Sequence, residues 1–166
     1  SYQTAFSYDG DLYGLKIDHL LVGDNFNPEV GFLRRDDFRR TFVQGQYSPR
    51  PSGIIAVRQF LFGASLDYIL SGKGQLETRI ARANFDVSFE NSDTFSADVQ
   101  QDYEFLSRPF QIAPDVTISV GGYEFQDYSA SYQMGPQRRL SGSFSLQHGE
   151  FYGGNIEWNH HVNQIR

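Results

Sequence analysis

Apolar and polar residues alternate along most of the chain. In residues 94–106, TFSADVQQDYEFL, the apolar residues Phe95, Ala97 and Val99 alternate with polar ones. Because successive side chains of a strand point to opposite faces, this period of two predicts a strand with one apolar and one polar face. The pattern recurs in residues 13–21, 60–70, 81–89, 128–132, 140–147 and 155–162. Short turns separate these runs, which predicts about nine antiparallel strands joined in sequence.

The runs on either side of Asn91–Asp93 predict one hairpin with a defined register. The apolar faces of the two strands must match, since a slip of one residue would move every side chain to the wrong side. Placing Phe89 opposite Phe95 satisfies this condition and leaves a three-residue loop. In that register Arg82 lies opposite Asp102 on the polar face, and Phe85 lies opposite Val99 on the apolar face.

Strand length favours a membrane protein. Several predicted strands have ten or more residues, whereas strands of globular proteins average about 5–6. Strands of about 9–11 residues with an aromatic-rich apolar face are typical of transmembrane barrels. We therefore predict an all-β fold, an antiparallel up-and-down meander of long strands forming part of an outer-membrane-type β-barrel. We expect residues 1–166 to be a single barrel segment cut from a longer chain.

The apolar face of this barrel would contact lipid. The residues expected to face lipid are Phe62, Phe85, Val99, Phe144 and Trp158. The alternative is a β-sandwich or barrel in water, in which the same face packs inward against a second sheet. Periodicity alone does not distinguish the two.

Composition supports strands and narrows the function. Phe, Tyr and Trp make up 16% of the chain and there are 16 glycines, a mixture that favours strands and turns. The net charge of −6 argues against nucleic acid as a partner. The absence of cysteine excludes disulfides, a thiolate zinc site and a cysteine nucleophile.

A dense charged cluster occupies residues 24–40, DNFNPEVGFLRRDDFRR. Its charged members are Asp24, Glu29, Arg34, Arg35, Asp36, Asp37, Arg39 and Arg40. A carboxylate pair could hydrolyse glycosides, but adjacent residues of a strand point to opposite faces. The arginines would also keep the carboxylates ionised, whereas a general acid must hold its proton. We expect no catalytic residues here.

We expect instead that this cluster, with Arg82 and Asp102, forms a charged network at the barrel rim or lumen. Residues 25–31 lack alternation and predict a loop, and residues 38–47 predict a strand. In that strand Arg40 would share the apolar, lipid-facing side with Phe38 and Phe42. Because an arginine in the lipid-facing band is costly, Arg40 should lie near a rim.

Candidate metal and nucleotide sites are weak. His160 and His161 are neighbours and would point to opposite faces of a strand. His19 and His148 have no ligand partner at a recognisable spacing. Residues 71–75, SGKGQ, lack the spacing of a phosphate-binding loop. We expect neither a metal nor a cofactor.

At residues 24–40 the sequence resembles a bacterial family catalogued as domain of unknown function 5916. The resemblance continues through residues 58–79, 101–128 and 135–154 in the same order. It implies a barrel-like region in the outer membrane of a Gram-negative bacterium, following a module similar to carbohydrate-binding family 9.

The expected function is then a membrane anchor or channel for that module. The implied partners are outer-membrane lipid, the rest of the same chain, and carbohydrate through the linked domain. The alternative function is a soluble β-sheet domain that binds or hydrolyses carbohydrate, with its aromatic residues as a stacking platform.

Overall fold

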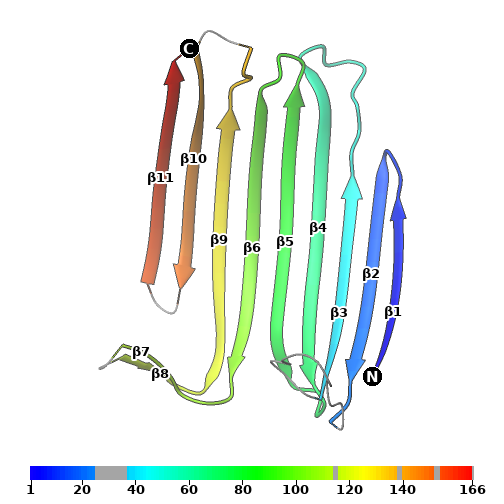
Figure 1. Cartoon of the computed structure of the whole chain (residues 1–166), viewed down its shortest axis with the longest axis vertical. Coiled ribbons are helices and arrows are strands. Elements are labelled where there is room, and N and C mark those ends of the chain that lie inside the picture. Colours follow the sequence, from blue (N-terminus) through cyan, green and yellow to red (C-terminus); the bar gives the residue numbers. More distant parts are fainter. Residues whose placement is uncertain (25–36, 114–115, 138–139, 152–153, 166) are drawn as a thin grey trace.

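The computed structural model describes residues 1–24, 37–113, 116–137, 140–151 and 154–165, and these contain strands and turns but no helix. Nine strands form one antiparallel sheet whose spatial order follows the chain (Figure 1). They are β1 (Tyr2–Asp9), β2 (Tyr13–Val22), β3 (Phe38–Tyr47), β4 (Val57–Ser71), β5 (Leu76–Phe89), β6 (Thr94–Leu106), β9 (Gly121–Gln133), β10 (Leu140–Phe151) and β11 (Gly154–Ile165). The predicted antiparallel meander is therefore confirmed.

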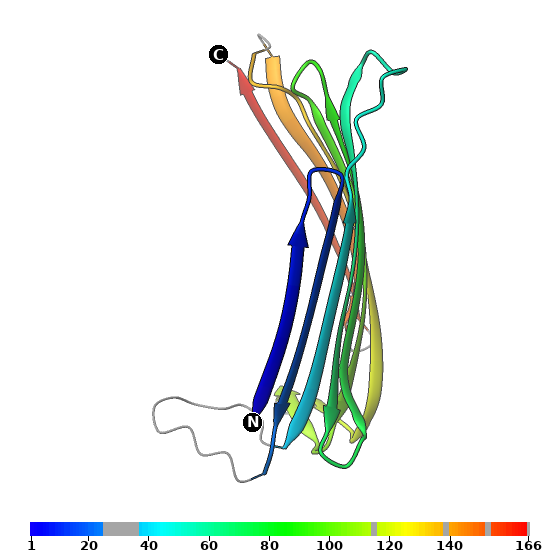
Figure 2. The same cartoon turned by 90° about the vertical axis from the view of Figure 1, so that its right-hand side faces the viewer.

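A small hairpin interrupts the meander between β6 and β9. Its strands, β7 (Phe110–Ala113) and β8 (Val116–Ile118), pair only with each other and lie at the lower end of the sheet in Figure 1. The large sheet is open, with β1 and β11 at its two edges. Figure 2 shows that the sheet is twisted and bends to one side, as expected from the right-handed twist of strands.

Two faces of the large sheet follow from its register, because antiparallel partners place their side chains on the same side. We define the apolar face as the one that carries Phe62, and the polar face as the one that carries Asp67. Tyr47, Phe62 and Phe85 are successive partners on the apolar face. Only four apolar residues among those described are buried, Val22, Val87, Ile118 and Phe125. The sheet is thus a single layer with little core of its own.

The β5–β6 hairpin keeps the predicted faces but not the predicted register. Arg82 pairs with Gln100 and Phe85 with Ala97, so the expected pairs of Arg82 with Asp102 and Phe85 with Val99 are wrong. The strands are displaced by two residues because the amide of Phe89 donates to the carbonyl oxygen of Asp93, which closes the loop one residue earlier. Ser92 completes this turn with a positive φ of 65°.

The lipid-facing position of Trp158 stays a prediction, because its side chain lies outside the described residues. Phe151 pairs with Gly154 across the β10–β11 turn, so even-numbered positions of β10 are in register with odd-numbered positions of β11. Phe144 is therefore the register partner of His161, and Trp158 is the register partner of Gln147. The turn thus offsets the alternating sequence patterns of the two strands by one residue.

Strand β3 has the predicted bounds, Phe38–Tyr47. Arg40 shares a face with Phe38 and Phe42 as expected, but this is the polar face. The register decides this, because Val43 pairs with Leu66 and thereby belongs to the apolar face. The prediction that Arg40 lies on the lipid-facing side is wrong for this reason.

Candidate functional site

The apolar face carries every exposed large hydrophobic residue of the nine-stranded sheet whose side chain is described. These are Tyr2, Phe6, Tyr8, Tyr13, Leu15, Ile17, Val43, Tyr47, Phe62, Leu66, Val99, Tyr128, Phe144 and Leu146. Phe62, Val99 and Phe144, all expected on this face, are among them, and Phe85 shares the face through its pairing with Phe62. No second layer of the described chain packs over it.

Aromatic rings form a continuous row across this face. Tyr13 stacks on Tyr47 with centroids 5.1 Å apart, and Tyr47 on Phe62 at 6.1 Å. Phe62 contacts Phe85 at 5.0 Å, and Phe85 contacts Phe95 at 6.5 Å. Aromatic pairs at such distances contribute attraction beyond simple burial. The row thus links β2 to β6 near the upper end of the sheet.

Charges on the apolar face occur at the opposite end. Below the aromatic row, the described side chains of this face include no Asp, Glu, Lys or Arg except Arg39, Glu77, Arg79 and Glu124. Arg79 donates from Nη2 to Glu124 Oε1 at 3.0 Å. The apolar face is therefore a band bounded by aromatic rings above and by charges below.

The polar face contains a well-formed ion pair between β3 and β4. Arg40 donates from Nε to Asp67 Oδ1 at 2.8 Å and from Nη2 to Asp67 Oδ2 at 2.6 Å. Of the predicted charged network, Arg40 is thus fixed on the polar face, with a partner that the sequence did not reveal.

Carboxylates predominate on the polar face of β5, β6 and β9. Asp102 accepts from Gln100 Nε2 at 2.6 Å, and Asp86 accepts from Asn84 Nδ2 at 2.6 Å. Asp98 and Asp127 belong to the same face, and Arg82 is the only Lys or Arg in these three strands of it. Arg82 and Asp102, predicted as direct partners, are instead diagonal neighbours.

The rest of the predicted cluster is only partly described. Asp24 is exposed after β2, and Arg39 is exposed on the apolar face. Asp37 has a positive φ of 49°, and its carbonyl oxygen accepts from the amide of Gly72 at 2.6 Å. Glu29, Arg34, Arg35 and Asp36, with the loop predicted over 25–31, lie outside the described residues.

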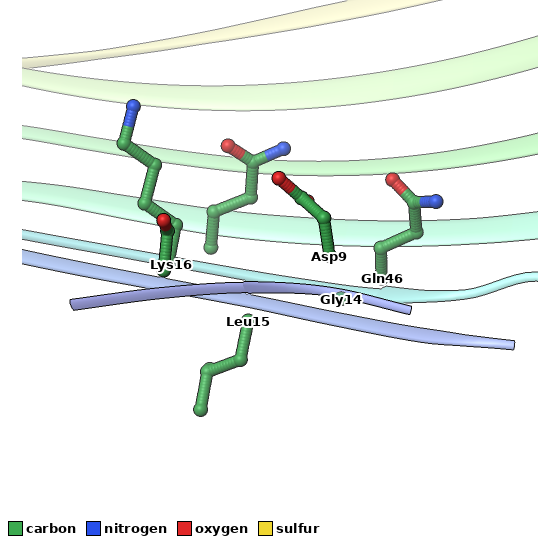
Figure 3. Close-up of a pocket in the computed structure, with 7 residues that line it drawn as sticks. Asp9, Gly14, Leu15, Lys16 and Gln46 are labelled. Atoms are coloured by element: carbon green, nitrogen blue, oxygen red, sulfur yellow. The ribbon is translucent and has the colours of Figure 1, made fainter. Parts of the chain in front are cut away.

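A shallow hollow opens on the polar face above Gly14. Figure 3 shows Asp9, Lys16 and Gln46 on one side of the strands and Leu15 on the other. The hollow forms because Gly14 has no side chain to fill it. Its volume is about 70 Å³, whereas pockets for small-molecule ligands have about 300–1,000 Å³. This hollow is therefore too small to enclose a substrate.

One buried carboxylate, Asp93, is not among the residues predicted from the sequence. It is 1% exposed and ties two turns at the upper end together. Its carboxylate accepts from the hydroxyl of Tyr132, from the amide of Gly135 at 2.7 Å and from Asn91 Nδ2 at 2.9 Å. The sequence analysis predicts only a turn at Asn91–Asp93, although Asn and Asp two residues apart are typical of side-chain-bonded turns.

No group of three or more His, Cys, Asp and Glu residues in the described part of the chain is placed to hold a metal ion. Nor do the described residues form a helix long and apolar enough to cross a membrane. No family model, curated protein or solved structure matches the chain. The function must therefore be argued from the two faces of the sheet.

Proposed function

We propose that this sheet is part of the wall of an outer-membrane β-barrel, with its apolar face against lipid and its polar face lining the interior. The observation that carries the proposal is the exposure of fourteen large hydrophobic residues on one face of a single layer. Apolar patches larger than a few hundred Å² are rare on monomeric proteins in water, and they mark membrane or protein contacts.

The curvature of the sheet supports this arrangement. The strands bend to one side in Figure 2, and the labelled polar side chains of Figure 3 point to the side on which the green and yellow strands rise. The polar face is then concave and the apolar face convex. Barrels in membranes have this arrangement, with polar residues inside and apolar residues outside.

The lower boundary of the apolar band runs obliquely to the strands, which provides a second, independent argument for a membrane barrel. Tyr47, Phe62, Phe85, Ala97, Ala130 and Leu146 form one register row. On the apolar face, the first charged, amide or histidine residue below this row lies eight positions away in β3 and six in β5. It lies four positions away in β6 and in β9, and two in β10. These residues are Arg39, Arg79, Gln101, Gln126 and His148.

From β3 to β10 the boundary thus shifts by six residues, from eight to two, over five strand steps, whereas in β2 His19 lies six positions from Tyr13, the partner of Tyr47. At ~3.3 Å per residue and ~4.8 Å between strands, this lower boundary is inclined by roughly 40° to a line perpendicular to the strands. Strands of membrane barrels are tilted by about 35–45° from the barrel axis. A band that is level in a membrane therefore requires this slope, whereas the interior of a sandwich does not.

The open edges indicate how such a barrel would close. Strands β1 and β11 run in the same direction (Figure 1), because nine antiparallel strands alternate. An all-antiparallel barrel needs an even number of strands, so an odd number of further strands would complete it. In this proposal the rest of the same chain supplies them.

The wall would anchor, or form a channel for, the carbohydrate-binding module that the family resemblance implies. The alternative, a soluble carbohydrate-binding or hydrolytic domain, requires a layer over the apolar face. It also requires a site, and the hollow above Gly14, at about 70 Å³, is too small to be one. The arrangement of the faces favours the membrane proposal.

Fractionation of the full-length protein tests this function. We expect it to sediment with outer membranes and to remain there after washing with 1 M salt or alkaline carbonate, since apolar contact with lipid is insensitive to both. Release by either wash would contradict the proposal and favour the soluble domain.

A further inference from the structure

One register row at the lower end of the apolar face differs from the band above it. Tyr68 in β4, Arg79 in β5, Tyr103 in β6 and Glu124 in β9 are successive partners, and we call them the Arg79 row. The guanidinium of Arg79 lies 5.9 Å from the centroid of the Tyr103 ring and pairs with Glu124. A cation and two phenol rings therefore lie side by side where the apolar band ends.

The side chain of Tyr103 extends away from the apolar band. A Cβ added at Gly122 would overlap the hydroxyl and ring of Tyr103, so the ring covers Gly122. Gly122 pairs with Phe105, one row further from the band than Tyr103 itself. The hydroxyl is thus directed toward the end of the sheet. Tyrosines at membrane interfaces adopt this arrangement, with an apolar ring and a polar tip at headgroup level.

Three further basic residues lie at this end of the sheet, together with the acidic Glu77 of β5. Arg39 belongs to the same face of β3, Lys73 is exposed in the β4–β5 turn, and Arg108 is exposed just after β6. The side chain of Glu124 is 58% exposed and that of Arg79 is 31% exposed. An ion pair so accessible to water is weak, so a stronger acceptor could replace Glu124.

We propose that the Arg79 row binds the phosphate groups of lipid headgroups at one surface of the membrane. A guanidinium matches a phosphate through two parallel hydrogen bonds, and the tyrosine hydroxyls can donate beside it. The proposal rests on the membrane function above. The headgroup site would set the depth of the sheet in the bilayer. It would also give this end of the sheet a preference for anionic lipids.

Spin-labelled lipids test the proposal on the full-length protein reconstituted into phosphatidylcholine vesicles. The measurement is the share of labelled phosphatidylglycerol and of labelled phosphatidylcholine immobilised at the protein surface. We expect phosphatidylglycerol to be preferred, since each basic residue near the surface strengthens such binding by about fivefold. Arg79→Gln should lower this preference by about twofold or more, Arg79→Lys should restore part of it, and Glu124→Gln should raise it.

Arg82→Gln is the matched control, because Arg82 lies three residues along the same strand on the opposite face. It should leave the lipid preference unchanged. An equal loss in Arg82→Gln, or no loss in Arg79→Gln, would overturn the headgroup site while leaving the membrane function intact. A complete absence of immobilised lipid would instead contradict the membrane function itself.

Discussion

The Asp67 carboxylate in β4 accepts three hydrogen bonds from the Arg40 guanidinium in β3, at 2.8, 3.1 and 2.6 Å. Asp67 is 18% exposed and Arg40 39% exposed, so water screens this pair less than a surface pair. Removing one partner leaves the other charge partly buried and unpaired.

We predict that Asp67→Asn and Arg40→Gln each lower the free energy of unfolding by about 1–2 kcal/mol. The double variant should lose less than the two single losses added together, because the two residues share one interaction. Urea unfolding in vesicles or detergent measures this. Additive losses would show that the two side chains act independently.

Replacement of Asp93 should lower the free energy of unfolding more than replacement of Asp67 or Arg40. Asp93→Ala removes the acceptor for three donors at a buried position and should cost about 2–4 kcal/mol. Tyr132→Phe removes one of these donors and should cost about 1 kcal/mol. The exposed Asp98 in the same hairpin provides the control, and Asp98→Asn should change stability by less than about 0.5 kcal/mol. Equal effects at Asp93 and Asp98 would contradict the role of Asp93 in joining the two turns.

Two glycines test the position of the Tyr103 ring. Gly122→Ala places a methyl group against Tyr103 and should destabilise the sheet by about 1–3 kcal/mol. At Gly45 on the same face no atom lies within 4 Å of an added Cβ, so Gly45→Ala should be neutral or stabilising by up to about 1 kcal/mol. Thermal unfolding of the two variants distinguishes these outcomes, and a harmless Gly122→Ala would show that the ring lies elsewhere.

The turn between β1 and β2 should respond to acid. The hydrogen bond from Arg50 lowers the pKa of Asp11, so this pair stabilises the folded state above pH ~4, the range in which the free carboxylate is ionised. That contribution is lost as the pH falls through the lowered pKa of Asp11. Arg50→Gln should therefore destabilise this turn at neutral pH and have no effect on its stability in strong acid.

Hydrogen exchange at the amide of Ser48 reports on this contact, because that amide donates to the carbonyl oxygen of Leu12 at 2.8 Å. At pH 7 the amide should exchange faster in Arg50→Gln than in the native protein. The difference should vanish below pH ~3. Arg58→Gln, which affects the pair with Glu90 at another turn, should leave Ser48 unchanged.

Alternation along the chain was enough to predict most strands of the large sheet, the bounds of β3 and the two-faced sheet, but not the β7–β8 hairpin. It could not predict register, because hydrogen bonds within the turns decide it. The loop closed by Asp93 displaces β5 against β6 by two residues, and the pairing of Phe151 with Gly154 brings Trp158 into register with Gln147. Both effects depend on turn geometry that hydrophobic periodicity does not encode.

The charged residues were harder to place. Phe38 and Phe42 suggested an apolar face for Arg40, but Val43 and Tyr47 occupy that face. The partner of Arg40 lies 27 residues away in β4, and only the strand pairing brings Asp67 beside it. The significance of Arg79 likewise follows from neighbours in β6 and β9 that are distant in sequence.

The central claim, that one face of the sheet contacts lipid and the other contacts water, is tested most directly in β6. The chain has no cysteine, so Asp98→Cys and Val99→Cys can each carry one environment-sensitive fluorophore in the full-length protein reconstituted into vesicles. We predict that lipid-borne nitroxides quench the label at 99 and not at 98, and that aqueous iodide quenches the label at 98 and not at 99. Quenching of both labels by iodide, with none by lipid nitroxides, would contradict the account.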